Sequence, residues 1–331
     1  MWHSFLRRSL GQYRRQKGLY DKVTLACFSA AWADGRSPVD LLHYALFRRD
    51  LGRPLPVRWV GLMAAALPDF SPVQRRMALG LLAEVRPDVL SAIDPAMLSD
   101  GRQLPAVASR MHSADDLARI DECQPAWREA FADRCRSAVL SGGLAVIGNG
   151  ATLNGLGVGS RIDQHSLVVR FNHFMGGGTL AEDVGERTDV WVLSPGYEGP
   201  VPDGVSWVVM SGPDMRYRLS DWHQLMPLLK QGVPLLTVPL AVWRQLTCLL
   251  QSPPSAGVLF LAHLNSLIGG HWQRVSIAGI GSGLAKNGRY HASLPRHLAS
   301  ERHAWDKEAK LVQAWRQNGL SAVTTENRGA P

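Results

Sequence analysis

The chain has 331 residues, of which 46% are hydrophobic and 19% are charged, a composition that excludes the disordered and fibrous classes. Its length allows one large core or one core with an appended module. The formal net charge of +8 favours an anionic partner, and charge alone does not choose between nucleic acid, anionic lipid and an acidic glycan.

The start of the chain carries no targeting signal that we recognise. Residues 1–22 lack the apolar core and the cleavage site of a secretory signal, and no apolar run of about 18 residues predicts a membrane-spanning helix. The cysteines are scattered and form no CxxC pair, so we expect reduced thiols in a cytoplasm and no zinc site or disulfide framework. They are Cys27, Cys123, Cys135 and Cys248.

Residues 1–22 interleave basic and hydrophobic residues at roughly helical spacing. The hydrophobic ones are Trp2, Phe5, Leu6, Leu10 and Tyr13, and the basic ones are Arg7, Arg8, Arg14, Arg15, Lys17 and Lys22. Two interpretations remain open. The segment is a basic amphipathic helix that lies on an anionic membrane surface, or it is a helix docked on the rest of the protein with its basic face in solvent.

Residues 41–136 repeat apolar residues at three- and four-residue spacing, which predicts a series of helices. Prolines fall between these blocks or in their first turns, where a missing amide hydrogen does least harm. Ser71-Pro72 is typical of an N-cap followed by proline at the first helical position. Because no fixed repeat period stands out, we expect an all-helical N-terminal module over residues 1–136 and no solenoid.

From about residue 140 short apolar runs alternate with helical stretches. The expected strands lie in LAVIGNG, SLVVRFN, TDVWVLS, VSWVVMSG, PLLTVP and RVSIAGIGS. This alternation predicts an α/β fold over residues 137–331, with a Rossmann-like, mostly parallel sheet and flanking helices. Such sheets bind ligands at the carboxyl ends of their strands, so the glycine turn after Ile147 is the first candidate site.

One interpretation of this turn is a dinucleotide site, in which Gly148-Asn149-Gly150 would begin a GxGxxG sequence. The third glycine position holds Leu153 instead, and the next strand ends in Arg170 and Asn172 where an acidic residue is expected. An NADP-dependent oxidoreductase could use that arginine, so this interpretation stays as an alternative.

A series of further positions follows the same turn in order. They are Gly157, Ile162-Asp163, Val169-Arg170-Phe171-Asn172 and Asp183-Val184-Gly185-Glu186-Arg187-Thr188. Together with the turn, this segment resembles the large sialylmotif of the family 29 sialyltransferases. Residues 254–257 (Pro-Ser-Ala-Gly), followed by Gly279-Ile280-Gly281, resemble the small sialylmotif, in which the family has Pro-Ser-Thr-Gly.

Two shorter motifs of that family have counterparts near the C-terminus. Tyr290-His291 corresponds to the family's third motif with the two residues in changed order, and His303 with Glu308 fits the very small motif, His-x4-Glu. The resemblance implies a GT-A-like fold variant and an inverting, metal-independent transfer of an acidic sugar from its CMP ester to a glycan hydroxyl. The donor would be CMP-sialic acid or CMP-Kdo, with no cofactor and no nucleic-acid partner. The catalytic half also has no Asp-x-Asp pair to hold a divalent cation.

The resemblance also implies roles for individual residues. Asn149 and Asn172 would bind CMP, with the backbone amides of Gly148 to Ala151 as an anion nest. Ser255, Ala256 and Gly257 would face the cytidine or the sugar carboxylate. The other donor-binding positions are Gly281 and Tyr290.

For the chemical step, His291 would hydrogen bond or protonate the leaving phosphate. His303 would be the general base, and Glu308 would have a structural or helix-capping role. His297 and Glu301 form a competing pair.

Several residues have structural alternatives. Asp163 is expected to cap a helix and Asp183 to shape a turn, while Arg170 either neutralises phosphate or pairs with Asp189 or Glu186. The tryptophans are expected in the core. They are Trp191, Trp207, Trp222 and Trp243.

The chain departs from the animal members of that family, which carry a membrane anchor and a cysteine bridge between the large and small motifs. Leu144 and Ala145 open the first motif, and Cys248 precedes the second. Both departures favour a bacterial, cytoplasmic enzyme, peripheral on the inner membrane, that acts in envelope polysaccharide or lipopolysaccharide synthesis. The remaining alternative is a non-catalytic nucleotide-sugar-binding module.

Overall fold

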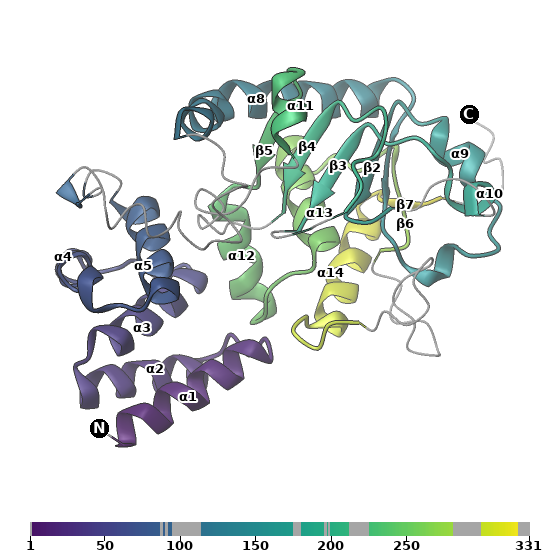
Figure 1. The fold of residues 1–331 in the computed structure, drawn as a ribbon. Helices are drawn as coiled ribbons and strands as arrows, with labels where there is room; N and C mark the ends of the chain where they lie inside the picture. The colour runs from purple at the N-terminus through teal and green to yellow at the C-terminus, as the bar shows by residue number, and fades with distance from the viewer. Residues whose placement is uncertain are drawn as a thin grey trace.

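The structure is a computed structural model. It describes residues 2–86, 89, 92–94, 114–174, 180–194, 197, 199–211, 225–280 and 299–323, with only the backbone at 83–84, 114–118 and 121. A helical N-terminal region stands beside a sheet with helices on both of its faces (Figure 1).

The N-terminal region is helical, as expected. Its helices are α1 (Trp2–Gln16), α2 (Lys22–Gly35), α3 (Pro38–Asp50), α4 (Val57–Ala65), the 3₁₀ turn η1 (Leu67–Asp69) and α5 (Pro72–Val85). Ser71 caps α5 in a capping box with Gln74, and Pro72 occupies the first turn as predicted. Residues of α3, α4 and α5 form a core of their own, in which Leu42, Met63 and Leu82 are fully buried.

Helix α1 turns its polar side inward. Its arginines pair with aspartates of the same region: Arg7 with Asp34, Arg8 with Asp40, Arg14 with Asp21 and Arg15 with Asp50. Gly11 lets the helix approach the ring of Phe28 in α2. The hydrophobic residues remain exposed, Trp2 at 78% and Tyr13 at 58%. The expectation of a docked helix with its basic face in solvent is therefore wrong in its orientation.

The sheet has seven strands, in the order β5-β4-β3-β2-β1-β6-β7, and all pairings between the described strands are parallel. The strands are β1 (Leu144–Ile147), β2 (Leu167–Phe171), β3 (Val190–Leu193), β4 (Trp207–Met210), β5 (Leu235–Thr237), β6 (Val275–Ala278) and β7 (Ser321–Ala322). The six expected strands and the α/β class are confirmed. The exposed edge strand β7 has no apolar run that could have predicted it.

Side chains alternate between the two faces of the sheet. In β1, Leu144 and Val146 join a core with α8 (Ala114–Leu140), α12 (Leu240–Leu250), α13 (Ala256–Leu267) and α14 (Trp305–Gln317). Ala145 and Ile147 point to the other face, toward α9 (Gly159–Asp163) and α10 (Ala181–Val184). Further along that face, β3 and β4 pack on α11 (Met226–Lys230).

Helix α8 runs across residue 136, where we expected the helical module to end. Its residues Phe131, Cys135 and Ala138 belong to the core under the sheet. The division into two domains stays a prediction.

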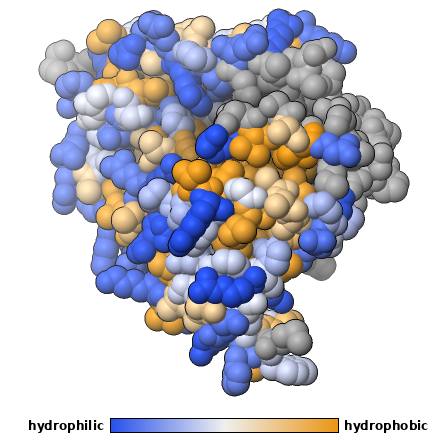
Figure 2. Space-filling model, turned by 90° about the vertical axis from the view of Figure 1, so that its left-hand side faces the viewer, coloured by the Kyte–Doolittle hydropathy of each residue, from blue (hydrophilic) through white to orange (hydrophobic). Residues whose placement is uncertain are grey.

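Exposed hydrophobic residues also occur on α4 and α5, at Val57, Leu62 and Val73. Figure 2 shows the side of the molecule with the helical region, where hydrophobic residues gather near the middle among hydrophilic ones. In the described part of the chain, no helix combines the length and the hydrophobicity needed to cross a bilayer.

The strand order reverses at β1. The chain runs outward from β1 to β5, then returns to add β6 and β7 on the other side of β1. Ligands of open parallel sheets commonly bind where the strand order reverses, outside the carboxyl ends of the strands. The loops after β1 and β6 are therefore the centre of the candidate site.

Candidate active site

The loops after β1 and β6 touch through glycines. The amide of Gly148 donates to Ala278 O at 2.8 Å, and that of Gly150 donates to Gly279 O at 3.2 Å. A Cβ at Gly148 would overlap the carbonyl oxygen of Gly279, so the approach requires glycine. Because these two amide hydrogens are used within the protein, the expected anion nest does not form from them.

The same turn does not open an α-helix. It leads into η3 (Ala151–Leu153), a 3₁₀ turn of three residues. A dinucleotide pyrophosphate needs free amides at the start of an α-helix, whereas here two amides of the turn are used within the protein and only a 3₁₀ turn follows. The dinucleotide interpretation therefore gains no support from the geometry.

Asn149 and Asn172 lie at the carboxyl ends of neighbouring strands, and each uses half of its amide group to hold the adjacent strand end. Asn149 Nδ2 donates to Phe171 O at 2.9 Å, and Asn172 Oδ1 accepts from Ser194 N at 2.7 Å. Asn172 has φ of 46°, a conformation that asparagine tolerates better than most residues. Within the described residues, Asn149 Oδ1 and Asn172 Nδ2 remain to face a ligand.

The start of α13 packs against the loop after β6 and is held by Glu308. Ser255 caps α13, and its amide and hydroxyl donate to the two carboxylate oxygens of Glu308 at 2.7 and 2.6 Å. Gly257, two residues further on, lies against Ile280. The Ser255 hydroxyl thus donates its hydrogen within the protein, and the expectation that it faces the cytidine or the sugar stays a prediction. Ala256 begins the helix and is half-buried.

Glu308, the other partner in this contact, lies on α14 and is buried. Burial raises the pKa of its carboxyl group to about 7, and the two hydrogen bonds from Ser255 oppose that rise. The assignment of Glu308 to a structural role at a helix start agrees with these contacts.

His303 precedes α14 and is oriented by Pro253. Its Nδ1 lies 2.9 Å from Pro253 O, and because a carbonyl oxygen only accepts, Nδ1 carries the hydrogen. Nε2 is then left with a lone pair. The ring contacts Trp305 edge to face, with centroids 5.1 Å apart. Burial lowers the pKa of His303 below its ordinary value, so the imidazole is neutral at pH 7 and can accept a proton.

A continuous path of contacts joins the glycine turn to His303. Gly148 meets Ile280, Ile280 meets Gly257 at the start of α13, and the preceding Pro253 binds His303. In Figure 1 the start of α14 lies at the same end of the sheet as the carboxyl ends of the strands. The structure thus brings these predicted residues to one edge.

Other predicted residues lie outside the described part of the chain: Gly281, Tyr290, His291, His297 and Trp222. Of the competing pair, Glu301 is exposed and binds Lys17. Trp191 is fully buried, and Trp207 and Trp243 pack against the core, as expected.

Arg170 points away from the loops after β1 and β6 and into the layer of α9 and α10. It is fully buried and donates to Val184 O at 2.6 Å and to Arg187 O at 2.8 Å. Its nearest carboxylate is Asp163, at 3.5 Å, and not Asp189 or Glu186 as we had expected. Burial lowers its pKa to about 10. Both expectations for Arg170 are wrong because its side chain points into the layer of α9 and α10.

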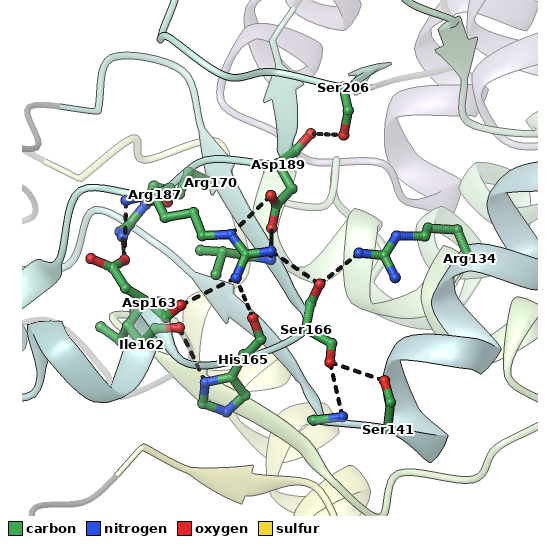
Figure 3. A network of polar contacts seen from close by, with 12 residues as sticks. Arg134, Ser141, Ile162, Asp163, His165, Ser166, Arg170, Arg187, Asp189 and Ser206 are labelled. Carbon is green, nitrogen blue, oxygen red and sulfur yellow. Dashed lines mark hydrogen bonds and ion pairs between the residues drawn. The ribbon is translucent and has the colours of Figure 1, made fainter.

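The second half of the large motif is a structural network (Figure 3). Asp163 accepts from the amides of Glu186 and Arg187, at 2.8 and 3.0 Å. Arg187 pairs with Asp189 at 2.9 Å, and Asp189 in turn accepts from Val168 N at 2.7 Å. These contacts fix the amino ends of β2 and β3, at the edge of the sheet opposite the candidate site. Asp163 therefore holds a turn and does not bind ligand.

Asp183 closes the glycine loop that follows the turn. It accepts from Gly155 N at 2.7 Å and from Gly157 N at 2.8 Å. The hydrogen bonds from the amides of Gly155 and Gly157, with that of Gly155 the stronger cause, hold the pKa of this carboxyl group below its usual range. The expectation that Asp183 shapes a turn agrees with this geometry.

The fold is that of an α/β protein with a parallel sheet, and the candidate site lies at the carboxyl edge of that sheet. Residues 118–204, which include the glycine turn and both asparagines, match the family model of glycosyltransferase family 29 (sialyltransferase). The comparison with curated proteins finds no match.

Among solved structures, a mammalian sialyltransferase in complex with Gal-beta-1-3GalNAc-ortho-nitrophenol is similar at 19% identity and a TM-score of 0.40, over 66% of this chain and 89% of that one. A second crystal structure of a mammalian sialyltransferase is similar at 18% identity and a TM-score of 0.42, over 71% and 87% of the two chains.

Proposed function

We propose that this protein is a glycosyltransferase that moves an acidic sugar from its CMP ester to a glycan hydroxyl. The observation that carries the proposal is the convergence of His303, with Nδ1 fixed by Pro253, and the glycine turn on one edge of the sheet. The match of residues 118–204 to the sialyltransferase family supports it independently.

In this mechanism, His303 Nε2 accepts the proton of the acceptor hydroxyl as its oxygen attacks the anomeric carbon. The bond from that carbon to the phosphate oxygen breaks at the same time, so the configuration inverts and CMP leaves. General base catalysis of this kind contributes about 10²- to 10⁴-fold in rate. His291 is proposed to hydrogen bond the leaving phosphate, and no metal or cofactor takes part.

The two asparagines have different parts in donor binding, because each has a different amide atom left. Asn172 Nδ2 is a donor and suits a phosphate or ribose oxygen. Asn149 Oδ1 is an acceptor and suits a ribose hydroxyl or the amino group of cytosine. Gly148 and Gly150 would let the donor approach the backbone closely, and Gly257 would present the start of α13 to it. Gly281 and Tyr290 complete the proposed site.

The test incubates the protein with CMP-sialic acid or CMP-Kdo and measures CMP release with and without glycan acceptors. We expect acceptor-dependent release with at least one donor, and its loss in His303→Ala with CMP binding nearly unchanged. The control is His271→Ala, an exposed histidine that follows the far end of α13. CMP binding without turnover would favour the non-catalytic module, and nicotinamide binding without CMP binding would favour the oxidoreductase.

We further propose that the enzyme is bacterial and works at the cytoplasmic face of a membrane, on an envelope polysaccharide or lipopolysaccharide. Helix α1 supports a lipid surface as the partner, because its exposed row consists of Trp2, Phe5, Leu6, Leu10 and Tyr13. Tryptophan and tyrosine near the ends of a row of leucine and phenylalanine are typical of a helix that lies in a bilayer interface. The pairing of its arginines means that hydrophobic contact, more than charge, would hold it there.

A further inference from the structure

The turn between α1 and α2 contacts the two segments that flank His303. Gly18 has φ of +75° and packs so closely that a Cβ there would overlap the carbonyl oxygen of Arg302. Tyr20 donates its amide hydrogen to Gln251 O at 3.0 Å. The turn therefore touches the residue directly before His303 and the residue that ends α12.

These two segments are the ones that orient the imidazole. Gln251 is followed by Ser252, whose hydroxyl accepts from Ala304 N at 3.2 Å, and by Pro253, whose carbonyl accepts from His303 Nδ1. Lys307, in the first turn of α14, donates to Leu250 O at 2.7 Å. A displacement of either segment would change the distance between His303 and Pro253.

The turn itself is firmly held by the helical region. Tyr20 is buried and packs on Phe47 with ring centroids 5.4 Å apart, and the buried Asp50 pairs with the half-buried Arg15. The pair of Lys17 and Glu301 is exposed, and it joins the same turn to the segment before His303. The fixed element is thus residues 17–20, with Tyr20 anchored on α3.

We infer that residues 17–20 are a positioning element for His303. They press the segment before α14 against the end of α12, so that the bond between His303 Nδ1 and Pro253 O forms and Nε2 keeps its lone pair. The helical N-terminal region is then a part of the catalytic unit and more than an appendage. An effect of residues 17–20 on catalysis rests on the proposed function, whereas their effect on the orientation of the His303 ring does not.

The main test compares Gly18→Ala with Gly52→Ala. Gly52 has a similar φ of +71° in the same region, but its Cβ would meet only side-chain carbons of Arg244, at 3.0 Å and beyond. Both variants carry the same backbone strain, and only the first displaces Arg302. We expect Gly18→Ala to lose on the order of 10²-fold in kcat, as for a catalytic group moved by about 1 Å, with KM for the donor little changed. Gly52→Ala should stay within about twofold.

A second readout does not need turnover. NMR titration of the imidazole should give His303 a pKa below 6.5 in the wild type and a pKa nearer 6.5 in Gly18→Ala, because burial of the ring lowers it. If this shift occurs while no protein releases CMP, the inference stands and the proposed function fails. Wild-type kcat and an unchanged His303 pKa in a folded Gly18→Ala would overturn the inference.

A charge reversal covers the case in which Gly18→Ala does not fold. Lys17→Glu places two carboxylates at the exposed contact with Glu301, and Lys17→Glu with Glu301→Lys restores opposite charges. We expect the single variant to shift the His303 pKa toward 6.5 and the double variant to restore it. No shift in the folded single variant would count against the turn as a positioning element.

Discussion

The carboxyl group of Glu308 is buried in its contact with Ser255, and the geometry makes protein stability depend on its protonation. Burial raises the folded pKa to about 7 from an ordinary value of 4.5. Between pH 4.5 and pH 7, the carboxyl group of Glu308 is therefore protonated in the folded state and ionised in the unfolded state. Its contribution to stability is present below pH 4.5 and falls as the pH rises toward 7, by about 3 kcal/mol in all.

The free energy of unfolding of the wild type should decrease as the pH rises from 5 to 8. We predict that this decrease is smaller in Glu308→Gln, because glutamine does not titrate. Urea unfolding at the two pH values should show a smaller decrease for the variant than for the wild type. Asp306→Asn is the control, because this exposed residue lies on the same first turn of α14. An equal decrease in the wild type and Glu308→Gln would show that Glu308 does not titrate in this range.

The neutral imidazole of His303 sets the pH dependence of the proposed reaction. Since burial lowers its pKa, the base is fully available at neutral pH, and the rate should fall only as the pH drops below 6.5. The measurement is kcat against pH between 4.5 and 8. A fall in rate centred above pH 7 would contradict the assignment of His303 as the base.

The meeting of the loops after β1 and β6 leaves no room for a side chain. Gly148→Ala places a Cβ against the backbone of Gly279 and against Ile280, so we predict a loss of about 1–3 kcal/mol and weaker CMP binding. Thermal unfolding and titration with CMP measure the two effects. Gly61→Ala in α4 is the control, since a Cβ there meets nothing within 4 Å. Equal behaviour of the two variants would mean that the loops separate without cost.

The strands and the glycine turn could be predicted because they depend on local sequence. Apolar runs such as residues 144–147 and 167–171 are buried on both faces of a parallel sheet, and this leaves a clear pattern. The contact between Ser255 and Glu308 joins residues 53 positions apart and has no local pattern. The burial of Arg170 was missed for the same reason, because its partners come from a different segment.

For the molecule as a whole, the reversed orientation of α1 could not be predicted from its periodicity. The pattern identifies two faces, but the aspartates that pair with the arginines lie on other helices and a turn. The same ion pairs determine how much positive charge helix α1 presents to a surface partner. With Arg8 and Arg15 bound to Asp40 and Asp50, little of the net charge on this helix is free to attract anionic lipid.

We predict that binding to vesicles containing anionic lipid falls at least tenfold in the double variant Leu6→Ser and Leu10→Ser. Raising the salt concentration should have a smaller effect, because hydrophobic contact is not screened. Cosedimentation with vesicles measures both. Leu62→Ser, in an exposed position of α4, is the control. A greater sensitivity to salt than to the double substitution would contradict hydrophobic docking.

Lys17 and Glu301 are 284 positions apart, and they meet beside the same imidazole. During synthesis on a ribosome, the helical region and the first five strands can assemble before the last segment has emerged. The contacts that orient His303 form only after residues 299–308 have emerged. A product that stops before residue 299 could assemble its first five strands and would still lack the contact between residues 17–20 and the segment before α14.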